Sequence, residues 1–262
     1  EAWYEYDFDS GERPKPLGLS LGITAVAVSQ PLVLAIFYAY KYGYLSMGNE
    51  PTSIQTQGPR PYAFEEGLLS HLAQPEGFGL LGGYLIFTWM LRLLPASYYG
   101  FEGGIDYGRA FLCLVVQDTI QFIMHRLEHS VSPAFYQKSH KPHHKFTNPR
   151  LFDAFNGSVA DTVIMILIPL YMTANLVHVN VWTYMAFGSV YANWLTLIHS
   201  EYTFPWDDSL FHPLGFGTPA DHHVHHAFFK FNYGHLFMWP DMICGTYRHP
   251  AMFAPKKFNK NI

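Results

Sequence analysis

Long apolar segments constrain this chain most, because roughly 20 apolar residues in a helix are needed to cross the hydrocarbon core of a bilayer. Such segments occupy residues 17–40, 78–94, 108–129, 154–177 and 181–199. Charged residues make up 14% of the 262 residues, whereas hydrophobic residues make up 49%, and soluble domains usually carry about 25% charged residues. We therefore predict an all-α integral membrane protein with four to five transmembrane helices.

The predicted spans divide the chain into two regions. Residues 1–107, with the first two spans, form an N-terminal membrane region, and residues 108–262 contain the other three spans followed by an extramembrane cap. The net charge of -4 and the lack of a basic run argue against a nucleic-acid partner. Cys113 and Cys244 have no C-x-x-C partner, so a disulfide framework or a thiolate metal site is not indicated.

Histidines gather at metal-ligand spacing within the second region. His125 and His129 are four residues apart at the end of the third predicted span, so that a helix places both rings on one face. Two H-x-x-H-H sets follow, and one further histidine ends the last span: His140, His143, His144, His199, His222, His225 and His226. Neutral imidazole is a common ligand for Zn, Cu, Fe and Ni. We interpret these nine residues as a metal centre held in a histidine-rich helical cap.

The order of the predicted spans brings all nine histidines to one side of the membrane. The third span ends there at His129, and the helical hairpin of the last two spans returns the chain there at His199. Most basic residues fall on the same side: Lys41, Arg60, Arg126, Lys138, Lys141, Lys145, Arg150, Lys230, Arg248, Lys256, Lys257 and Lys260. The positive-inside rule then places the histidines on the cytoplasmic face.

Local signals indicate where the helices of the cap begin. Pro142 falls in the first turn of a helix that carries the first H-x-x-H-H set, where its missing N–H is not needed. For the second set, Thr218 as N-cap, Pro219 at N1 and Asp221 at N3 predict a variant of the capping box.

Nine imidazoles exceed what one ion requires. Two metals with four or five nitrogens each are the natural count, and His223 and His212 are candidate extra ligands. Acidic residues do not repeat with the sets, which argues against a carboxylate-bridged site and the 2-His-1-carboxylate pattern. Ligand type alone does not distinguish iron from zinc. His71, His178, His235 and His249 are interpreted as isolated core or surface histidines.

Polar residues also line the face of the third span that carries His125 and His129. Asp118 and Gln121 continue this stripe at helical spacing, well inside an apolar run. A polar group there is costly and usually functional. We predict that Asp118, and with weaker support Gln121, orients a ligating histidine by hydrogen-bonding its far N–H; the alternative is simple pairing with a neighbouring helix.

The motifs HRLEH (125–129), HKPHHKFTNP (140–149), YANWLTLIHS (191–200) and DHHVHHAFFKFNYGHLFMWPDMICGTYRHP (221–250) resemble the fatty acid hydroxylase/sterol desaturase superfamily. They look most like sterol C-5 desaturases, also called lathosterol oxidases. The resemblance covers about residues 108–250. The segments HSEY (199–202) and WPDM (239–242), and His223, depart from the sterol desaturase pattern, which leaves the substrate open.

The resemblance implies a membrane-embedded di-iron centre, with zinc as the alternative metal, and ligation by the nine histidines. It implies activation of O2 with electrons from NAD(P)H through cytochrome b5 or a similar donor, and desaturation or hydroxylation of a lipid, foremost a sterol. The endoplasmic reticulum is the implied location, and another organellar membrane is the alternative. Two other functions stay open: hydroxylation of a fatty acyl chain, methylsterol or carotenoid, and a catalytically silent subunit of a larger membrane complex.

Overall fold

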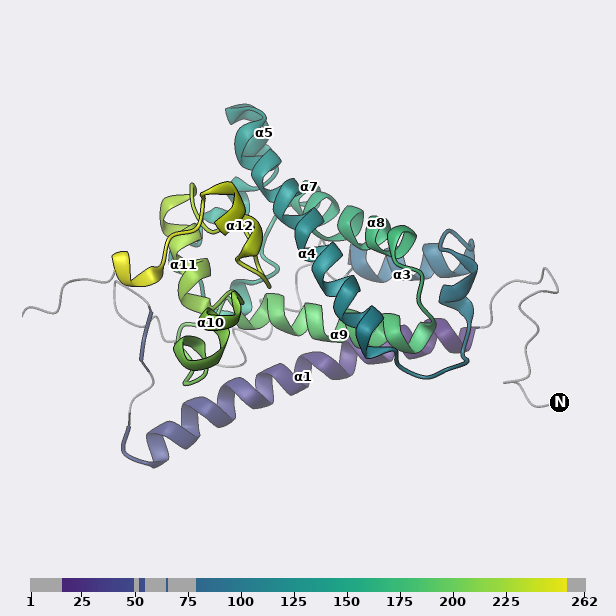
Figure 1. Ribbon diagram of the computed structural model, residues 1–262, viewed down its shortest axis with the longest axis horizontal. Helices are drawn as coiled ribbons and strands as arrows, with labels where there is room; N and C mark the ends of the chain where they lie inside the picture. Colours follow the sequence, from purple (N-terminus) through teal and green to yellow (C-terminus); the bar gives the residue numbers. More distant parts are fainter. Residues whose placement is uncertain (1–15, 50–51, 55–64, 66–78, 254–262) are drawn as a thin grey trace, which may run out of the picture.

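The computed structural model describes residues 16–49, 52–54, 65 and 79–253, and these residues are predominantly helical (Figure 1). The longer helices are α1 (Pro16–Ser46), α3 (Leu80–Met90), α4 (Tyr107–Ser130), α8 (Ile168–Leu176), α9 (Val181–Leu197) and α11 (Pro219–Phe228). Shorter helices are α5 (Pro133–Lys138), α6 (Lys141–His144), α7 (Val159–Thr162), α10 (His212–Leu214) and α12 (Trp239–Cys244). Single turns are η3 (Ala96–Tyr99), η4 (Leu151–Asp153), η5 (Val163–Leu167), η6 (Asp207–Phe211) and η7 (Pro250–Met252). Within this described part, β-structure is limited to two isolated bridges, Ser53 with Tyr202 and Phe216 with Phe237.

Helix α4 matches the predicted third span to within one residue at each end. The Asp106 carboxylate accepts a 2.9 Å hydrogen bond from the backbone N–H of Arg109 and so caps the first turn. This bond satisfies one of the N–H groups that a helix start leaves without a partner. The capped helix then runs uninterrupted to Ser130 and carries His125 and His129 near its C-terminal end.

The predicted hairpin of two helices is present, with a later start than the sequence suggested. Its first arm is the continuous helix α7–η5–α8 over 159–176 rather than 154–177, because Ser158 caps it by accepting from the N–H of Asp161. The preceding residues form η4 instead. Asn180 caps the second arm, α9, by accepting from the N–H of Thr183 at 2.9 Å.

Two helices of the described chain are long and apolar enough to cross a membrane, α4 and the helix over Val159–Leu176. The segments predicted as further spans differ in form. The run over 17–40 lies within α1, whose 31 residues include Pro31. The run over 78–94 contains α3, with 11 residues, and the run over 181–199 contains α9, with 17 residues. The structure therefore supports a helical membrane protein with two such helices.

The helices pack around α9. Helix α1 runs alongside α9, and α4 packs against both α8 and α9 (Figure 1). Phe187 and Tyr191 of α9 are buried in the main apolar core, together with Tyr98. The Tyr98 hydroxyl donates a 3.0 Å hydrogen bond to the carbonyl of Val177. These contacts fix the hairpin against the remainder of the bundle.

The C-terminal segment forms a small cap beside the C-terminal half of α4, where α10, α11 and α12 lie together (Figure 1). Helix α11 begins as predicted: Thr218 and Asp221 form the capping box, with Pro219 in the first turn. The carbonyls of Phe231 and Tyr233, in the loop after α11, accept hydrogen bonds from histidines. The fold thus brings four separate chain segments to one end of the bundle.

Candidate metal centre

The nine predicted histidines lie together in two groups. In each group the candidate ligand nitrogens all lie within 4.8 Å of one another. The first group, here called the five-histidine group, contains His125, His129, His140, His144 and His225. The second, the four-histidine group, contains His143, His199, His222 and His226. One group thus offers five candidate ligand nitrogens and the other four.

Each H-x-x-H-H set is shared between the two groups. Residues four apart stay together, so that His140 and His144 belong to the five-histidine group, while His143 between them belongs to the other. In α11, His222 and His226 belong to the four-histidine group, whereas His225 belongs to the five-histidine group. One turn of helix therefore presents rings on two neighbouring faces, because adjacent helical positions are separated by about 100°.

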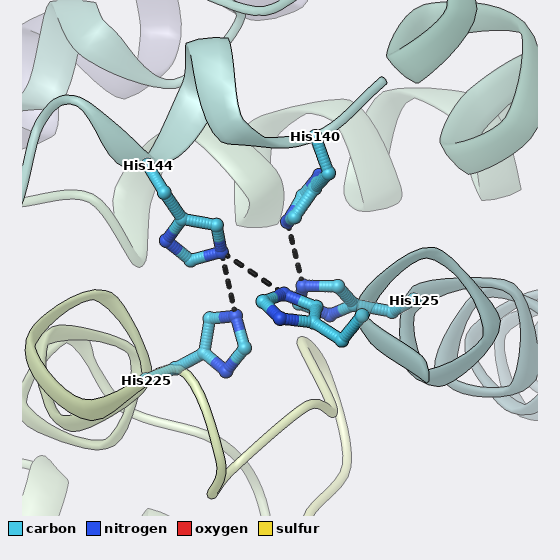
Figure 2. Close-up of side chains that lie close together, drawn as sticks. His125, His140, His144 and His225 are labelled. Carbon is cyan, nitrogen blue, oxygen red and sulfur yellow. Dashed lines mark hydrogen bonds between the residues drawn. The ribbon is translucent and has the colours of Figure 1, made fainter. Parts of the chain in front are cut away.

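The rings of the five-histidine group meet through their Nε2 atoms, as Figure 2 shows for His125 and His140 and for His144 and His225. The Nε2–Nε2 distance is 2.9 Å for the first pair and 3.0 Å for the second. His129 approaches His144 in the same way, at 3.1 Å. Helix α4, α6 with its preceding residue, and α11 all contribute to this group.

The four-histidine group has the same geometry. Nε2 of His222 lies 3.0 Å from Nε2 of His199 and 3.0 Å from Nε2 of His226. Nε2 of His143 lies 3.5 Å from that of His199. All four rings are at least nine-tenths buried. Two nitrogens that bind one ion at about 2.1 Å, with an N–metal–N angle between about 90° and the tetrahedral value, lie about 3.0 to 3.4 Å apart. The observed spacing therefore suits ligands of a common ion.

Backbone carbonyls fix the proton position on several of these rings. Nδ1 of His125 lies 2.7 Å from the carbonyl oxygen of Tyr233, and Nδ1 of His225 lies 2.8 Å from that of Phe231. Nδ1 of His143 and of His199 likewise face the carbonyls of Asn156 and Leu195 at 3.0 and 2.7 Å. A carbonyl only accepts, so each Nδ1 carries the proton and each neutral ring keeps its lone pair at Nε2.

This proton arrangement tests whether a metal fits. His143 and His199 turn two Nε2 lone pairs toward each other, and neither nitrogen has a proton to share with the other. In the five-histidine group, Nε2 of His125 and Nε2 of His225 likewise carry lone pairs rather than protons, and the candidate ligand atoms of the group lie within 4.8 Å of one another. Converging lone pairs repel unless a cation lies between them, and neutral imidazole with its far N–H hydrogen-bonded is the usual form of a histidine ligand. The donor set therefore fits metal ions.

The environment keeps the rings neutral. Burial lowers the pKa of His222, His225 and His226 well below the usual 6.5, and the neighbouring imidazoles lower it further. Burial also lowers the pKa of His143. Neutral rings have lone pairs available at physiological pH, which metal binding requires.

Two carboxyl groups that the sequence reasoning missed lie beside the five-histidine group. Asp161 Oδ1 is 2.6 Å from Nδ1 of His140, and Glu128 Oε2 is 3.5 Å from the same nitrogen. Both residues are buried. The carboxylate of Asp161 thus holds the ring of His140 as carbonyls hold the others. Asp161 lies in an apolar run, the signal that drew attention to Asp118, and could have been found in the same way.

Asp118 has partners other than those predicted. Its Oδ1 and Oδ2 accept hydrogen bonds from the backbone N–H groups of Leu236 and Phe237, at 2.8 and 2.9 Å. The Tyr191 hydroxyl donates to Oδ1 at 3.3 Å. The prediction that Asp118 bonds a ligating ring is therefore corrected: this carboxylate binds the loop after α11, since that loop presents two inward-facing N–H groups. Gln121 is buried, and its side-chain oxygen has no partner within the described chain.

The two candidate extra ligands lie outside both groups. Nε2 of His223 is 3.0 Å from the carbonyl of Ser200, because this helical position points away from the rings of α11 that meet the other histidines. His212 lies between two carboxylates, with Nδ1 2.9 Å from Asp208 and Nε2 2.9 Å from Asp221. His212 thereby joins η6 to the N-terminal turn of α11.

Of the four histidines interpreted as isolated, His178 and His249 lie away from the two groups, and His71 falls outside the described residues. His235 differs from the interpretation. It is buried, its ring contacts His125 and His222, and its Nδ1 has no hydrogen-bond partner in the described chain. The sequence offered one signal for it, its position in the loop directly after the second histidine set.

Comparison with known proteins places this geometry in context. The model of the family described as fatty acid hydroxylase matches residues 110–246, which contain all nine histidines. The chain is 68% identical over its whole length to an alternative squalene epoxidase of Phaeodactylum tricornutum and covers 75% of that protein. It is 29% identical to the lathosterol oxidase of Mus musculus over 57% of the chain and 49% of that protein.

A third relative is the cholesterol 25-hydroxylase of Rattus norvegicus, 32% identical over 52% of the chain and 46% of that protein. The chain thus spans about half the length of these two mammalian relatives, and three quarters of the diatom relative. No solved structure gives a significant match.

Proposed function

The chain belongs to the fatty acid hydroxylase family of oxygen-dependent oxidoreductases, and on that premise we propose that it converts squalene to its epoxide. The observation that carries this proposal is the 68% identity, along the whole chain, to the alternative squalene epoxidase of Phaeodactylum tricornutum. Identity to the sterol-modifying relatives is 29% and 32%, over little more than half of the chain. This substrate replaces the sterol that the motifs first suggested.

The two histidine groups are the proposed ligands of two iron ions, one ion for each group. Support comes from the converging Nε2 atoms, whose spacing of 2.9 to 3.5 Å suits a shared ion. Zinc binds the same donor type, and the choice of iron rests on the redox reaction, which zinc does not catalyse. When bound, the two irons would activate dioxygen and deliver one of its oxygen atoms to the substrate.

The reaction requires two electrons. One oxygen atom of O2 adds across a carbon–carbon double bond of squalene, and the other leaves as water together with two protons. Cytochrome b5, or a similar carrier that draws on NAD(P)H, is the proposed electron donor. Four lysines lie in the described chain near the proposed ligands, and an acidic carrier would meet them: Lys138, Lys141, Lys145 and Lys230.

The protein's own residues position the reaction beside the bilayer. Squalene is a hydrocarbon and dissolves in the membrane core, so it reaches a site that opens toward lipid. Helix α4 carries His125 and His129 on its buried side and exposes Ile123 and Leu127 on the other, at 49% and 45%. We infer that squalene approaches along this exposed apolar face, while the buried rings keep water away from the reacting atoms.

The number of membrane spans that we propose is larger than two, the number of described helices that are long and apolar enough to cross a membrane. We propose four to five spans, with residues 1–107 as an N-terminal membrane region and residues 108–262 as the catalytic region. The endoplasmic reticulum is the proposed location, as the resemblance to sterol C-5 desaturases implies. The cytoplasmic orientation of the histidines follows from the distribution of lysine and arginine.

The second candidate function is desaturation or hydroxylation of a sterol. It is favoured by the similarity to lathosterol oxidase and cholesterol 25-hydroxylase. A fatty acyl or carotenoid hydroxylase, and a silent subunit of a membrane complex, are the remaining alternatives. Eight of the nine imidazoles in the two groups are buried, and burying them without an ion is costly, which argues against an ion-free protein.

The test is expression of the full chain in yeast whose own squalene epoxidase is repressed, under an atmosphere of ¹⁸O2. Mass spectrometry of the extracted lipids should find squalene epoxide that carries one ¹⁸O atom. Protein with His143→Ala should form none, whereas His178→Ala, which alters an exposed histidine away from both groups, should form as much as the wild type. Labelled hydroxysterol or a new sterol double bond without epoxide would favour the second candidate. Unchanged lipids with both ions bound would favour the structural subunit.

A further inference from the structure

Hydrogen bonds to the backbone at and just after His235 hold this residue in place in the loop that follows α11. Its carbonyl accepts a 3.0 Å hydrogen bond from the indole N–H of Trp194 in α9. The next two residues, Leu236 and Phe237, donate their backbone N–H groups to Asp118 of α4. The carbonyl of Leu236 accepts from the N–H of Gly217 at 2.9 Å. Three separate elements therefore fix where the His235 side chain starts.

Two glycines make this close packing feasible. A Cβ atom at Gly217 would overlap the carbonyl oxygen of His235, and one at Gly234 would overlap that of Phe237. Real Cβ atoms do not approach backbone oxygen so closely, so a side chain at either position would displace the loop. Glycine is the residue that permits such an approach. The position of His235 thus depends on specific residues around it.

The imidazole of His235 lies beside both histidine groups. Its ring centre is 5.1 Å from that of His125 in the five-histidine group and 5.2 Å from that of His222 in the four-histidine group. These separations equal those between rings within the groups, such as 5.1 Å for His125 and His129. His235 is nonetheless a member of neither group, because its nitrogens are not within 4.8 Å of all the others.

Its chemistry distinguishes His235 from a side chain that fills space. The residue is 6% exposed, and its Nδ1 is buried without a partner among the described residues. The rings of His125, His143, His199 and His225 give their Nδ1 protons to carbonyls. Nδ1 of His235 has no such bond within the described chain, a property that it shares with His144, His222 and His226. A buried polar atom normally has a partner, and an apolar ring would occupy the same space without this cost.

We propose that His235 is a positioning residue of the metal centre, which hydrogen-bonds a small ligand held at the two histidine groups. Its nitrogens lie outside both ligand groups yet beside one ring of each, which leaves a small molecule as the partner it can reach. A neutral imidazole offers one N–H donor and one lone pair, so it can hold water or an oxygen-containing molecule in a set orientation. This inference rests on the proposed ligand set and does not depend on squalene as substrate.

The test uses full-length protein loaded with Co²⁺ and titrated with azide, a small anion that binds metal ions and accepts hydrogen bonds. Visible absorption of the cobalt reports azide binding without any turnover. In His235→Phe, which keeps a planar aromatic ring and removes the N–H, the Kd for azide should rise roughly fivefold to tenfold, the value of one hydrogen bond. In His235→Gln, which keeps a donor, the Kd should stay within about twofold of the wild-type value.

The matched control is His178→Phe, the same change at an exposed histidine away from both groups, which should leave the Kd unchanged. Cobalt content by elemental analysis should remain the same in all variants. An unchanged Kd in His235→Phe, or a wild type that binds no azide, would overturn the proposal. Loss of cobalt from both His235 variants would also overturn it, because His235 would then act on the ions themselves. If squalene epoxide is absent while the azide effect holds, the proposed function fails and the role of His235 stands.

Discussion

Asp161 Oδ1 lies 2.6 Å from Nδ1 of His140 and so links the helix over 159–176 to the five-histidine group. Both side chains are buried, with exposed fractions of 3% for His140 and 13% for Asp161. This contact holds the ring of His140 with its Nε2 2.9 Å from Nε2 of His125. A ligand held in this way is oriented before the ion arrives.

The first prediction follows from this contact. Asp161→Asn keeps the shape and weakens the acceptor, and metal affinity should fall roughly 10-fold to 100-fold, as for other residues that orient a ligating histidine. Competition with a chelator of known affinity measures the change. Asp208→Asn alters a carboxylate that is 90% exposed and should leave the affinity unchanged. Equal affinities for Asp161→Asn and the wild type would show that this contact does not orient a ligand.

The second prediction concerns Asp118. Asp118→Ala leaves the N–H groups of Leu236 and Phe237 without their acceptors, and each buried unpaired donor costs about 1–3 kcal/mol. The Tm in detergent should therefore fall by roughly 5 to 15 °C. The neighbouring change Thr119→Ala removes a hydroxyl that bonds within its own exposed helix face and should shift the Tm by less than about 2 °C. A Tm for Asp118→Ala that equals the control would mean that the loop is held by other contacts.

The sequence predicted local features of the site better than their assembly. Thr218 and Asp221 cap α11 as expected, because a capping box depends on residues three positions apart. The assignment of His143 and His144 to different histidine groups could not be predicted from the sequence. It depends on where α4 and α9 end relative to α6 in the folded chain. Asp118 was predicted from its apolar surroundings to orient a ligating histidine, but its partner is a loop more than a hundred residues away. Glu128 and Asp161 were missed because their contact with His140 depends on how α4 and the helix over 159–176 pack around it.

The third prediction uses the pH dependence of stability. The hydrogen bond with Asp221 raises the pKa of His212 above its usual 6.5, Asp208 raises it further, and burial opposes both. His249, whose ring centre is 4.8 Å away, and Asp207 are further titratable groups that interact with His212. Since the folded pKa exceeds the unfolded value, the stabilisation is complete below pH 6.5 and is lost as the pH rises through the folded pKa. His212→Gln should thus lower the Tm most below pH 6.5.

The check is the Tm difference between wild type and His212→Gln from pH 5.5 to 9, with the same metal content in both. The difference should shrink steadily as the pH rises. A difference that is constant with pH would show that His212 is not held as a cation between Asp208 and Asp221.

The fourth prediction is that metal removal destabilises the fold. Without ions, the lone pairs of His143 and His199 face each other inside the protein. Adding back ions at about 1,000 times their Kd should stabilise the protein by about 4 kcal/mol for each site, which corresponds to roughly 10 °C in Tm. Differential scanning fluorimetry before and after chelation measures this shift. A Tm that is the same in both states would contradict the assignment of the groups as ligands.

The central claim is that two separate histidine groups each hold one ion, and elemental analysis of the purified protein tests it most directly. Wild-type protein should contain about two metal ions per chain. His199→Ala removes one ring of the four-histidine group alone, and His129→Ala one ring of the five-histidine group alone, so each variant should retain about one. A wild type with no bound metal, or with a single ion that both variants lose, would contradict the account.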